Sequence, residues 1–468
     1  MTLRSRMLGL AFALALGEGA GLKLGAFGAA WPVALAACIL TLSLGAGFSL
    51  RGWGYAATAL LGLALALSSE CARAAVLEES VRTNGAFACE LTVASPPNVR
   101  TGRDGRRWVS FPGAADGVRF LAVVQLAEAE ELPREGERWR VSGWLERRPF
   151  FERTRRRLWV TGRGTSAERV APAPGWRRAL IGVRESFSRR LGIGLEADST
   201  AAELSRAILL GERRRLDPGL KRRFEAAGAL HLFAISGLHV GVIGMLLVLL
   251  SRVLFLPYRF VALPVVPILW AYVLMIGAPP SAVRAGAMAT IVVAAPLCWR
   301  KADGVAAWAL VFLATHLMKP ALIGEVGSLL SFAVMLAILV WSEAVGRGVL
   351  FAAWGAGVPV VAHVFGTFTL GGLVSNLVLI PAAVGVVVAG VAGILVSFAS
   401  SALAAYVNHL SALFIGGMAA VAGAVASLPG AHFEVMKWPL STCALWYLAL
   451  ALVIWLLARL RLRRERMV

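Results

Sequence analysis

Long apolar runs separated by short polar loops dominate the second half of the chain. Each run approaches the roughly 20 residues that a helix needs to cross a bilayer. They lie near 231–251, 260–277, 282–299, 304–318, 325–342, 349–365, 370–398, 402–426 and 438–458. Earlier apolar runs lie near 7–24, 31–50 and 54–69. The pattern predicts about twelve membrane-spanning helices, in an N-terminal region 1–70 and a larger membrane domain 229–468.

The block between these regions has a different periodicity. Short runs with alternating apolar residues are separated by turns that contain Pro, Gly and Asp, at Phe87–Ala94, Arg107–Phe111, Val118–Gln125, Glu137–Glu146 and Arg157–Gly162. They predict a small all-β barrel over 71–170. An oligonucleotide/oligosaccharide-binding (OB) fold is the natural candidate, although the strand count also fits other small β domains.

A helical linker is expected over 171–228. Trp176, Leu180, Val183 and Phe187 recur on one face of a basic segment. A basic amphipathic helix of this kind often lies on a membrane surface.

Composition and charge support a multi-pass membrane protein. The chain is 58% hydrophobic with a mean hydropathy of +0.72, beyond the usual range of soluble domains. Its net charge of +20 comes mostly from arginine. Basic residues occur in every second connection, at Arg252 and Arg259, Arg300 and Lys301, Arg347, and Arg459 to Arg466. Because cytoplasmic loops are rich in Lys and Arg, we expect cytoplasmic termini and an extracytoplasmic segment 71–228.

Several polar side chains fall within the apolar runs. Such groups cost about 2.5–3.5 kcal/mol on insertion scales and usually face a bundle interior or a water-filled cavity. We therefore predict that they line a polar pathway; the candidates are His231, Ser236, His239, Arg284, Glu325, Ser331 and Asn376. Two other interpretations remain open: close helix packing at Ser236 and its glycine neighbour, and snorkelling of Arg284 toward the interface.

The predicted barrel interleaves aromatic and basic residues. Aromatic faces stack bases and arginines neutralise phosphates in proteins that bind single strands without sequence preference. The predicted DNA-binding residues are Arg106, Arg107, Trp108, Arg119, Arg138, Trp139, Arg140, Trp144, Arg147 and Arg148. The alternative for each aromatic residue is a place in the core of the barrel.

Motifs for metal or nucleotide chemistry are absent from the sequence. The histidines form no HxH, HExxH or HxxxH arrangement, and there is no GxxxxGK[ST] loop. We expect no cofactor, no metal site and no catalytic residue.

The polar motifs together resemble the competence domain of the ComEC family. The order and spacing agree over roughly 205–390, through Ala207–Glu212, Phe224–Gly228, His231–Val240, Pro280–Ala285, Leu330–Phe332 and Asn376 with Ile380-Pro381. The region 1–165 is similar to the N-terminal part of the family in layout more than in motif.

The resemblance implies a channel in the bacterial inner membrane that admits single-stranded DNA during natural transformation. Many family members carry a C-terminal metallo-β-lactamase-like domain with an HxHxDH motif. This sequence reaches Val468 without that motif, so we expect no nuclease activity. The family implies a separate nuclease and a cytosolic helicase-like ATPase as partners, besides DNA and the lipid bilayer; a second copy of the chain is a further candidate.

Two alternative functions come from other classes. A membrane-embedded hydrolase would use Ser236 and His239, which are three residues apart, as nucleophile and base. A transporter would carry another anionic polymer or a lipid precursor along the same polar residues.

Overall fold

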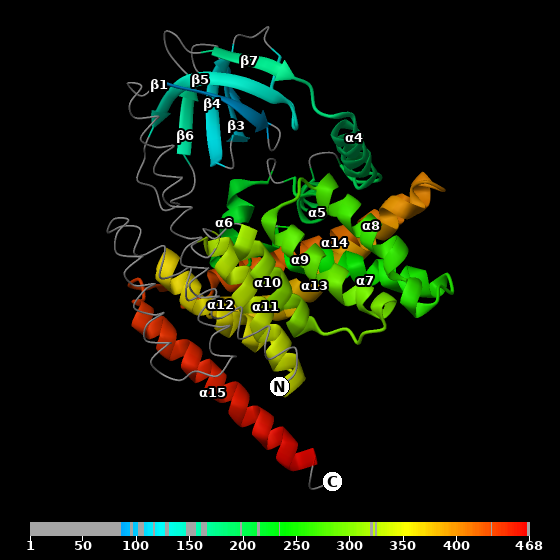
Figure 1. The fold of residues 1–468 in the computed structure, drawn as a ribbon, viewed down its shortest axis with the longest axis vertical. Coiled ribbons are helices and arrows are strands. Elements are labelled where there is room, and N and C mark those ends of the chain that lie inside the picture. Colours follow the sequence, from blue (N-terminus) through cyan, green and yellow to red (C-terminus); the bar gives the residue numbers. More distant parts are fainter. Residues whose placement is uncertain are drawn as a thin grey trace, which may run out of the picture. The chain divides into compact units, whose positions relative to one another are not determined.

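A computed structural model shows two compact units (Figure 1), one within 71–186 and one that contains 187–468. It describes residues 86–93, 97–101, 107–115, 118–126, 131–146, 156–160, 166–196, 199–212, 216–233, 235–318, 322, 325–431 and 433–465. The helices predicted over 1–70 lie outside the described residues.

The first unit is built from β strands. Each of the five predicted strands corresponds to an observed one, and two short strands, β2 and β7, are additional. The bounds are β1 Ala86–Val93, β2 Asn98–Thr101, β3 Arg107–Ala115, β4 Val118–Leu126, β5 Arg138–Glu146, β6 Arg156–Val160 and β7 Ser166–Ala171.

Strand pairing closes the sheet on itself. The path runs β1-β3-β4-β6-β5, and β5 pairs with β1 again. The β4–β6 pair is parallel, whereas the other pairs in this ring are antiparallel. A closed sheet has no exposed edge within the ring. β2 and β7 extend it by pairing with β3 and β5.

The interior of the ring follows the two-residue period of the strands. Along β5, Trp139 and Val141 are buried, whereas Arg138 and Arg140 are exposed. The core consists of Leu91, Val93, Val109, Phe111, Ala122, Val124, Trp139 and Val141.

Three helices occupy most of the predicted linker: α4 Gly175–Arg190, α5 Thr200–Leu210 and α6 Pro218–Ala226. On α4, Trp176 and Val183 are exposed, whereas Leu180 and Phe187 are half-buried. Asp217 caps α6 by accepting from the backbone N–H of Leu220 at 2.8 Å. Backbone hydrogen bonds from Leu220 and Gly219 hold the pKa of Asp217 below its usual value.

The second unit is a bundle of apolar helices, one for each of the nine runs predicted after residue 229. Six of these segments are long and apolar enough to cross a membrane, and α7, α10 and α12 are shorter apolar helices. The bounds are α7 Gly237–Val253, α8 Ala262–Met275, α9 Pro280–Ala294, α10 Gly304–Met318, α11 Val326–Ala344, α12 Val349–Phe365, α13 Gly371–Val396, α14 Ser401–Ser427 and α15 Leu440–Glu465. The chain is therefore a multi-pass helical membrane protein.

One helix prediction needs correction. The run that was expected to be helical from residue 231 starts with a 3-10 turn, Leu230–Phe233, and α7 begins only at Gly237. The run over 370–398 forms one continuous helix, α13, which passes through Pro381. Neighbouring helices and local adjustments make proline tolerable in apolar helices.

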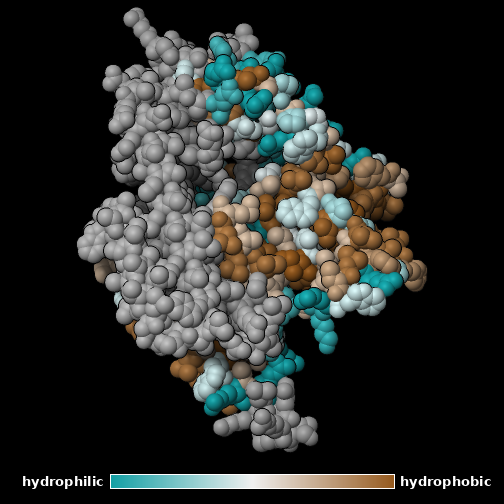
Figure 2. Space-filling model, in the orientation of Figure 1, coloured by the Kyte–Doolittle hydropathy of each residue, from teal (hydrophilic) through white to brown (hydrophobic). Residues whose placement is uncertain are grey.

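The outer surface of the helices matches a lipid environment. Figure 2 shows hydrophobic side chains over much of the helical surface that is not grey. Exposed examples include Leu249, Leu263 and Leu452. In water such a continuous apolar surface would mark an interaction site; on these helices it is the face expected toward acyl chains.

Two pairs of connections between helices are in contact with one another. β8 (Thr367–Phe368), between α12 and α13, pairs with β9 (Phe433–Glu434), between α14 and α15. The guanidinium of Arg259 lies 5.4 Å from the centre of the Trp299 ring, which joins the α7–α8 and α9–α10 connections. Arg259 and Arg300 thus lie in neighbouring loops.

Candidate functional site

The start of α7 carries two of the predicted pathway residues. Ser236 is the N-cap: its Oγ accepts from the backbone N–H of Leu238 at 3.2 Å. The backbone N–H of Ser236 donates to Nδ1 of His239 at 3.1 Å, which completes a capping box. His239 is 1% exposed. Both side chains therefore stabilise a helix start.

The same contact bears on the hydrolase alternative. The Oγ of Ser236 lies 3.1 Å from Nδ1 of His239, within the reach of a nucleophile and its base. However, that nitrogen already accepts the backbone N–H of Ser236. The capping box accounts for the pair without catalysis.

The start of α9 lies against the start of α7. The Ser281 hydroxyl donates to the carbonyl of Ile235 at 2.7 Å, one residue before the N-cap. A Cβ built on Gly237 would lie 3.5 Å from that of Ala285, so the two helices approach closely. Small residues permit this approach.

Arg284 joins α9 to the start of α11. Its side chain is 5% exposed. Its Nη2 donates to the carbonyl of Gly327 at 3.0 Å and its Nε donates to the Oγ of Ser331 at 3.2 Å. The guanidinium also lies 5.4 Å from the centre of the Phe332 ring. Arg284 is thus held inside the bundle by specific partners and does not snorkel.

Two further polar residues occupy the first turn of α11. Glu325 is the N-cap residue, but its side chain makes no capping hydrogen bond. Its carboxylate interacts electrostatically with Arg284. Ser328 is 2% exposed, and its Oγ has no hydrogen-bond partner among the described residues. Ser328 belongs to the same polar stripe as the predicted residues Glu325 and Ser331.

The start of α13 is tied to the segment that precedes α7. The buried Ser375 hydroxyl donates to the carbonyl of Ala227 at 2.7 Å. Gly228, with a φ of +69°, approaches Gly372 so closely that an added Cβ would lie 2.9 Å from its Cα. Next to Ser375, the Oδ1 of Asn376 is buried and finds no hydrogen-bond partner within the described part of the chain.

The predicted pathway residues therefore fall into three groups. Ser236 and His239 join Arg284, Glu325 and Ser331 through the α7–α9–α11 contacts. Asn376 lies on α13, where the described contacts lead to Ala227. His231 lies in the 3-10 turn before α7 and is exposed.

The polar groups share one end of the bundle. α7, α9, α11 and α13 are alternate helices, so in an up-and-down bundle their N-termini lie on the same side. The N-terminus of a helix carries a partial positive charge. Transporters direct such ends at anionic substrates. The buried charge of Arg284 adds to this field, and Glu325 offsets part of it.

The predicted DNA-binding residues of the barrel lie in different places. Arg138 and Arg140 are exposed on β5, and Arg140 pairs with Glu90 at 2.7 Å. Trp108 is half-buried on β3. Arg107, Arg119 and Trp144 lie on β3, β4 and β5, whereas Arg106, Arg147 and Arg148 lie outside the described residues.

Trp139 does not fit a base-stacking role. It is 5% exposed within the barrel core, and its Nε1 donates to the carboxylate of Glu137 at 2.9 Å. The two-residue period of β5 turns this ring inward because Arg138 and Arg140 face outward. The core alternative holds for this tryptophan.

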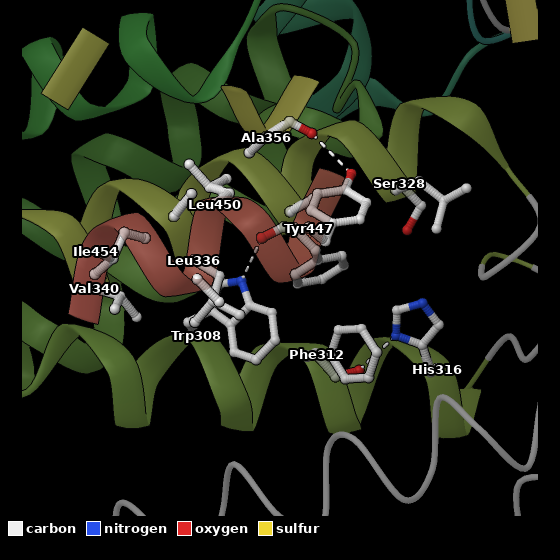
Figure 3. Close-up of a pocket in the computed structure, with 15 residues that line it drawn as sticks. Trp308, Phe312, His316, Ser328, Leu336, Val340, Ala356, Tyr447, Leu450 and Ile454 are labelled. Atoms are coloured by element: carbon white, nitrogen blue, oxygen red, sulfur yellow. Dashed lines mark hydrogen bonds between the residues drawn. The ribbon is translucent and has the colours of Figure 1, made fainter. Parts of the chain in front are cut away.

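The sequence analysis also missed a cavity of about 530 Å³ between α10, α11, α12 and α15 (Figure 3). Its walls are mostly apolar, with Leu336, Val340 and Leu450 among them. His316 and Ser328 bring polar atoms to it. Ser328 lies between the predicted pathway residues Glu325 and Ser331, whereas His316 has no such neighbour in the sequence, and only the packing of the helices brings the two together.

Comparison with known proteins places this bundle in a family. Residues 208–460, more than half of the 468-residue chain, match the family model described as Competence protein. ComE operon protein 3 of Bacillus subtilis (strain 168) is 28% identical over 182 residues, which are 38% of this chain and 23% of the relative. Competence protein ComA of Neisseria gonorrhoeae is 29% identical over 295 residues, 57% of this chain and 41% of the relative. The match thus spans less than half the length of either curated relative. No solved structure matches the chain.

Proposed function

The chain belongs to the Competence protein family, and we propose that it takes part in DNA uptake for natural transformation as a membrane channel for single-stranded DNA. The family match covers all the polar residues at the starts of α7, α9, α11 and α13. It supports DNA as the transported polyanion over another anionic polymer or a lipid precursor.

The observation that carries the channel proposal is the gathering of polar groups at the starts of alternate helices. A polyanion that enters a bilayer needs positive potential and hydrogen-bond donors, because hydrocarbon provides neither. Arg284, held by Gly327 and Ser331, supplies a fixed positive charge. The Oδ1 of Asn376 is a buried acceptor without a described partner, so it can accept a hydrogen bond from the amino group of a base in a passing strand.

The first unit suits the capture of DNA before entry. Its closed ring of five strands with one parallel pair supports an OB-like barrel, a fold that binds oligonucleotides. Arg138 and Arg140 provide an exposed basic stretch on β5, and Trp108 on β3 provides a partly exposed ring. Arginines and aromatic rings of this kind bind single strands.

The loop arrangement supports an orientation. Arg259 and Trp299 bring two basic connections together, whereas the β8–β9 pair joins two connections of the opposite set. By the positive-inside rule the basic connections are cytoplasmic. We infer that the starts of α7, α9, α11 and α13 face the extracytoplasmic side, from which the DNA enters. A separate nuclease and a cytosolic helicase-like ATPase are the partners that we propose.

The conduit is tested by Asn376→Leu. The change removes a buried acceptor without a described partner from a half-buried residue, so folding should be unchanged or slightly improved. Loss of one polar contact with the strand is expected to lower uptake about tenfold, which corresponds to roughly 1.4 kcal/mol. The measurement is the transfer of labelled DNA into the cytoplasm of a deletion strain complemented with this chain, at equal protein abundance.

The matched control is Asn408→Leu on the neighbouring α14. The Nδ2 of Asn408 donates to the carbonyls of Arg190 and Ile193 at 3.0 and 2.9 Å, so this change should lower the free energy of unfolding by about 2 kcal/mol and reduce abundance. Wild-type uptake by the Asn376→Leu variant would remove Asn376 from the pathway.

Capture by the barrel is tested by changing Arg138 and Arg140 together to alanine in the full chain. If each arginine contacts a phosphate of a single strand, the slope of log affinity against log salt concentration should become shallower by about 1.4, roughly 0.7 for each contact. Binding of a labelled single-stranded oligonucleotide to the protein in nanodiscs at several salt concentrations gives this slope.

The control for the barrel changes Arg178 and Arg189 to alanine. Both are exposed on α4, so the net charge changes equally away from the strands. An equal effect of the two double variants would mean that general charge, and not the face of β5, attracts the DNA.

A further inference from the structure

The cavity beside α11 is elongated and has two unlike ends (Figure 3). His316 and Ser328 lie at one end, and Val340 and Ile454 lie at the other. An apolar space that carries polar groups only at one end has the form of a site for an amphiphile. We propose that it binds one aliphatic chain of a hydroxyl-bearing lipid, such as a monoacylglycerol, with the hydroxyl group between Ser328 and His316.

His316 provides a hydrogen-bond acceptor at the polar end of the cavity. Its Nδ1 lies 2.8 Å from the carbonyl of Phe312. Because a carbonyl oxygen only accepts, Nδ1 carries a proton, and Nε2 of the neutral ring is an acceptor. In Figure 3 this second nitrogen lies on the side of the ring toward Ser328.

Ser328 provides a hydrogen-bond donor at the same end of the cavity. The residue is 2% exposed and its Oγ makes no hydrogen bond with the described residues, although buried hydroxyl groups normally have a partner. A ligand hydroxyl satisfies both positions, since it donates to Nε2 of His316 and accepts the proton of Ser328.

Two other polar groups on the cavity wall already have hydrogen-bond partners within the protein. The indole Nε1 of Trp308 donates to the carbonyl of Phe332 at 3.0 Å, and the hydroxyl of Tyr447 donates to the carbonyl of Ala356 at 2.8 Å. The ligand is therefore recognised at one end only, and the remaining contacts are apolar.

Charge narrows the choice of head group. Arg284 acts electrostatically on His316, and it bonds to Gly327 and Ser331 on either side of Ser328. A cationic head group is disfavoured by this charge. A carboxylate has no proton to donate to the lone pair of Nε2. A neutral hydroxyl satisfies both constraints.

The rest of the cavity favours an aliphatic chain over water. Apolar cavities stay dry, and about 530 Å³ lies within the roughly 300–1,000 Å³ of small-molecule sites. α15 forms one wall, and its opposite face exposes Leu445, Leu448 and Leu452. In a bilayer those residues face lipid, so the source of such a chain is one helix away.

The test uses the full chain in nanodiscs of dioleoylphosphatidylcholine that contain a monoacylglycerol with a photoreactive diazirine in its acyl chain. After irradiation, labelled peptides are expected from α11 and α15, and unlabelled monoolein should compete. Ser328→Ala should weaken this competition about threefold to tenfold, the effect of one neutral hydrogen bond. Leu336→Trp should abolish labelling because the indole ring obstructs the path of the acyl chain along the cavity.

The control is Ser342→Ala, which removes an exposed hydroxyl from the same helix and should leave labelling unchanged. Competition by oleic acid equal to that by monoolein would overturn the hydroxyl assignment. Labelling that persists in Leu336→Trp, or absence of labelling on α11 and α15, would overturn the site; in the latter case another segment of the chain fills the cavity.

Discussion

The two faces of α11 differ in whether their buried polar groups have hydrogen-bond partners within the protein. On one face, Gly327 and Ser331 each accept a hydrogen bond from Arg284 of α9. On the other face, Ser328, Leu336 and Val340 border a cavity, and the Ser328 hydroxyl has no partner among the described residues. One face is a completed protein contact, whereas the other is complete only with a ligand.

The comparison shows that the surroundings of a polar side chain on α11 decide whether it holds two helices together or is available to a ligand. Ser328 and Ser331 are three residues apart on α11. Ser331 accepts a hydrogen bond from the buried guanidinium of Arg284, whereas Ser328 borders the apolar cavity and its hydroxyl has no described partner. Substitutions that treat the two faces alike should therefore give unlike results.

The largest effect is expected for Arg284→Met. The side chain volume is nearly kept, but Gly327 and Ser331 lose their donor and Glu325 loses the nearby positive charge. Hydrogen bonds of charged groups contribute more than neutral ones, so the free energy of unfolding should fall by about 2 kcal/mol. Thermal unfolding of the purified protein in detergent measures this change.

Arg284→Lys is the companion variant. It keeps the charge but not the paired donors, so stability should return only in part. Wild-type stability of Arg284→Met would show that Arg284 does not tie α9 to α11, and the contrast between the faces would disappear.

A smaller loss is expected for Ser331→Ala, about 1 kcal/mol, because one hydrogen bond between membrane helices contributes on this scale. It should be non-additive with Arg284→Met, since both changes remove the same contact. A double-mutant cycle on unfolding in detergent supplies the coupling energy.

The smallest effect, with the opposite sign, is expected for Ser328→Ala. Without added acylglycerol the variant should be more stable by about 0.5 kcal/mol, because a buried hydroxyl without a partner is removed. The same unfolding assay measures it. A loss of stability as large as that of Ser331→Ala would mean that both faces of α11 are filled in the same way.

The sequence predicts the helices well because a bilayer imposes a length and a composition on each one. The nine runs after residue 229 correspond to α7 through α15. Errors occur at the ends, where local bonds decide. The capping box of Ser236 and His239 starts α7 at Gly237, although the apolar run begins earlier.

The site is only partly predictable. Arg284 stands out because a charge within an apolar run is rare, but its partners Gly327 and Ser331 come from a helix more than forty residues away. For Trp139, the alternation with Arg138 and Arg140 already contains the signal for an inward ring. The cavity is not visible in any single segment, because three consecutive helices and the distant α15 form it together.

The short ladder between β8 and β9 has a consequence for how the bundle is built. It ties the turn before α13 to the turn after α14, so these two helices form a clasped hairpin. During synthesis β8 is made first, and it can pair with β9 only after α13 and α14 have been made. The hydrogen bonds of Trp446 and Tyr447 to α12 follow later still. Both strands of the ladder are therefore available for pairing before the synthesis of α15 is complete.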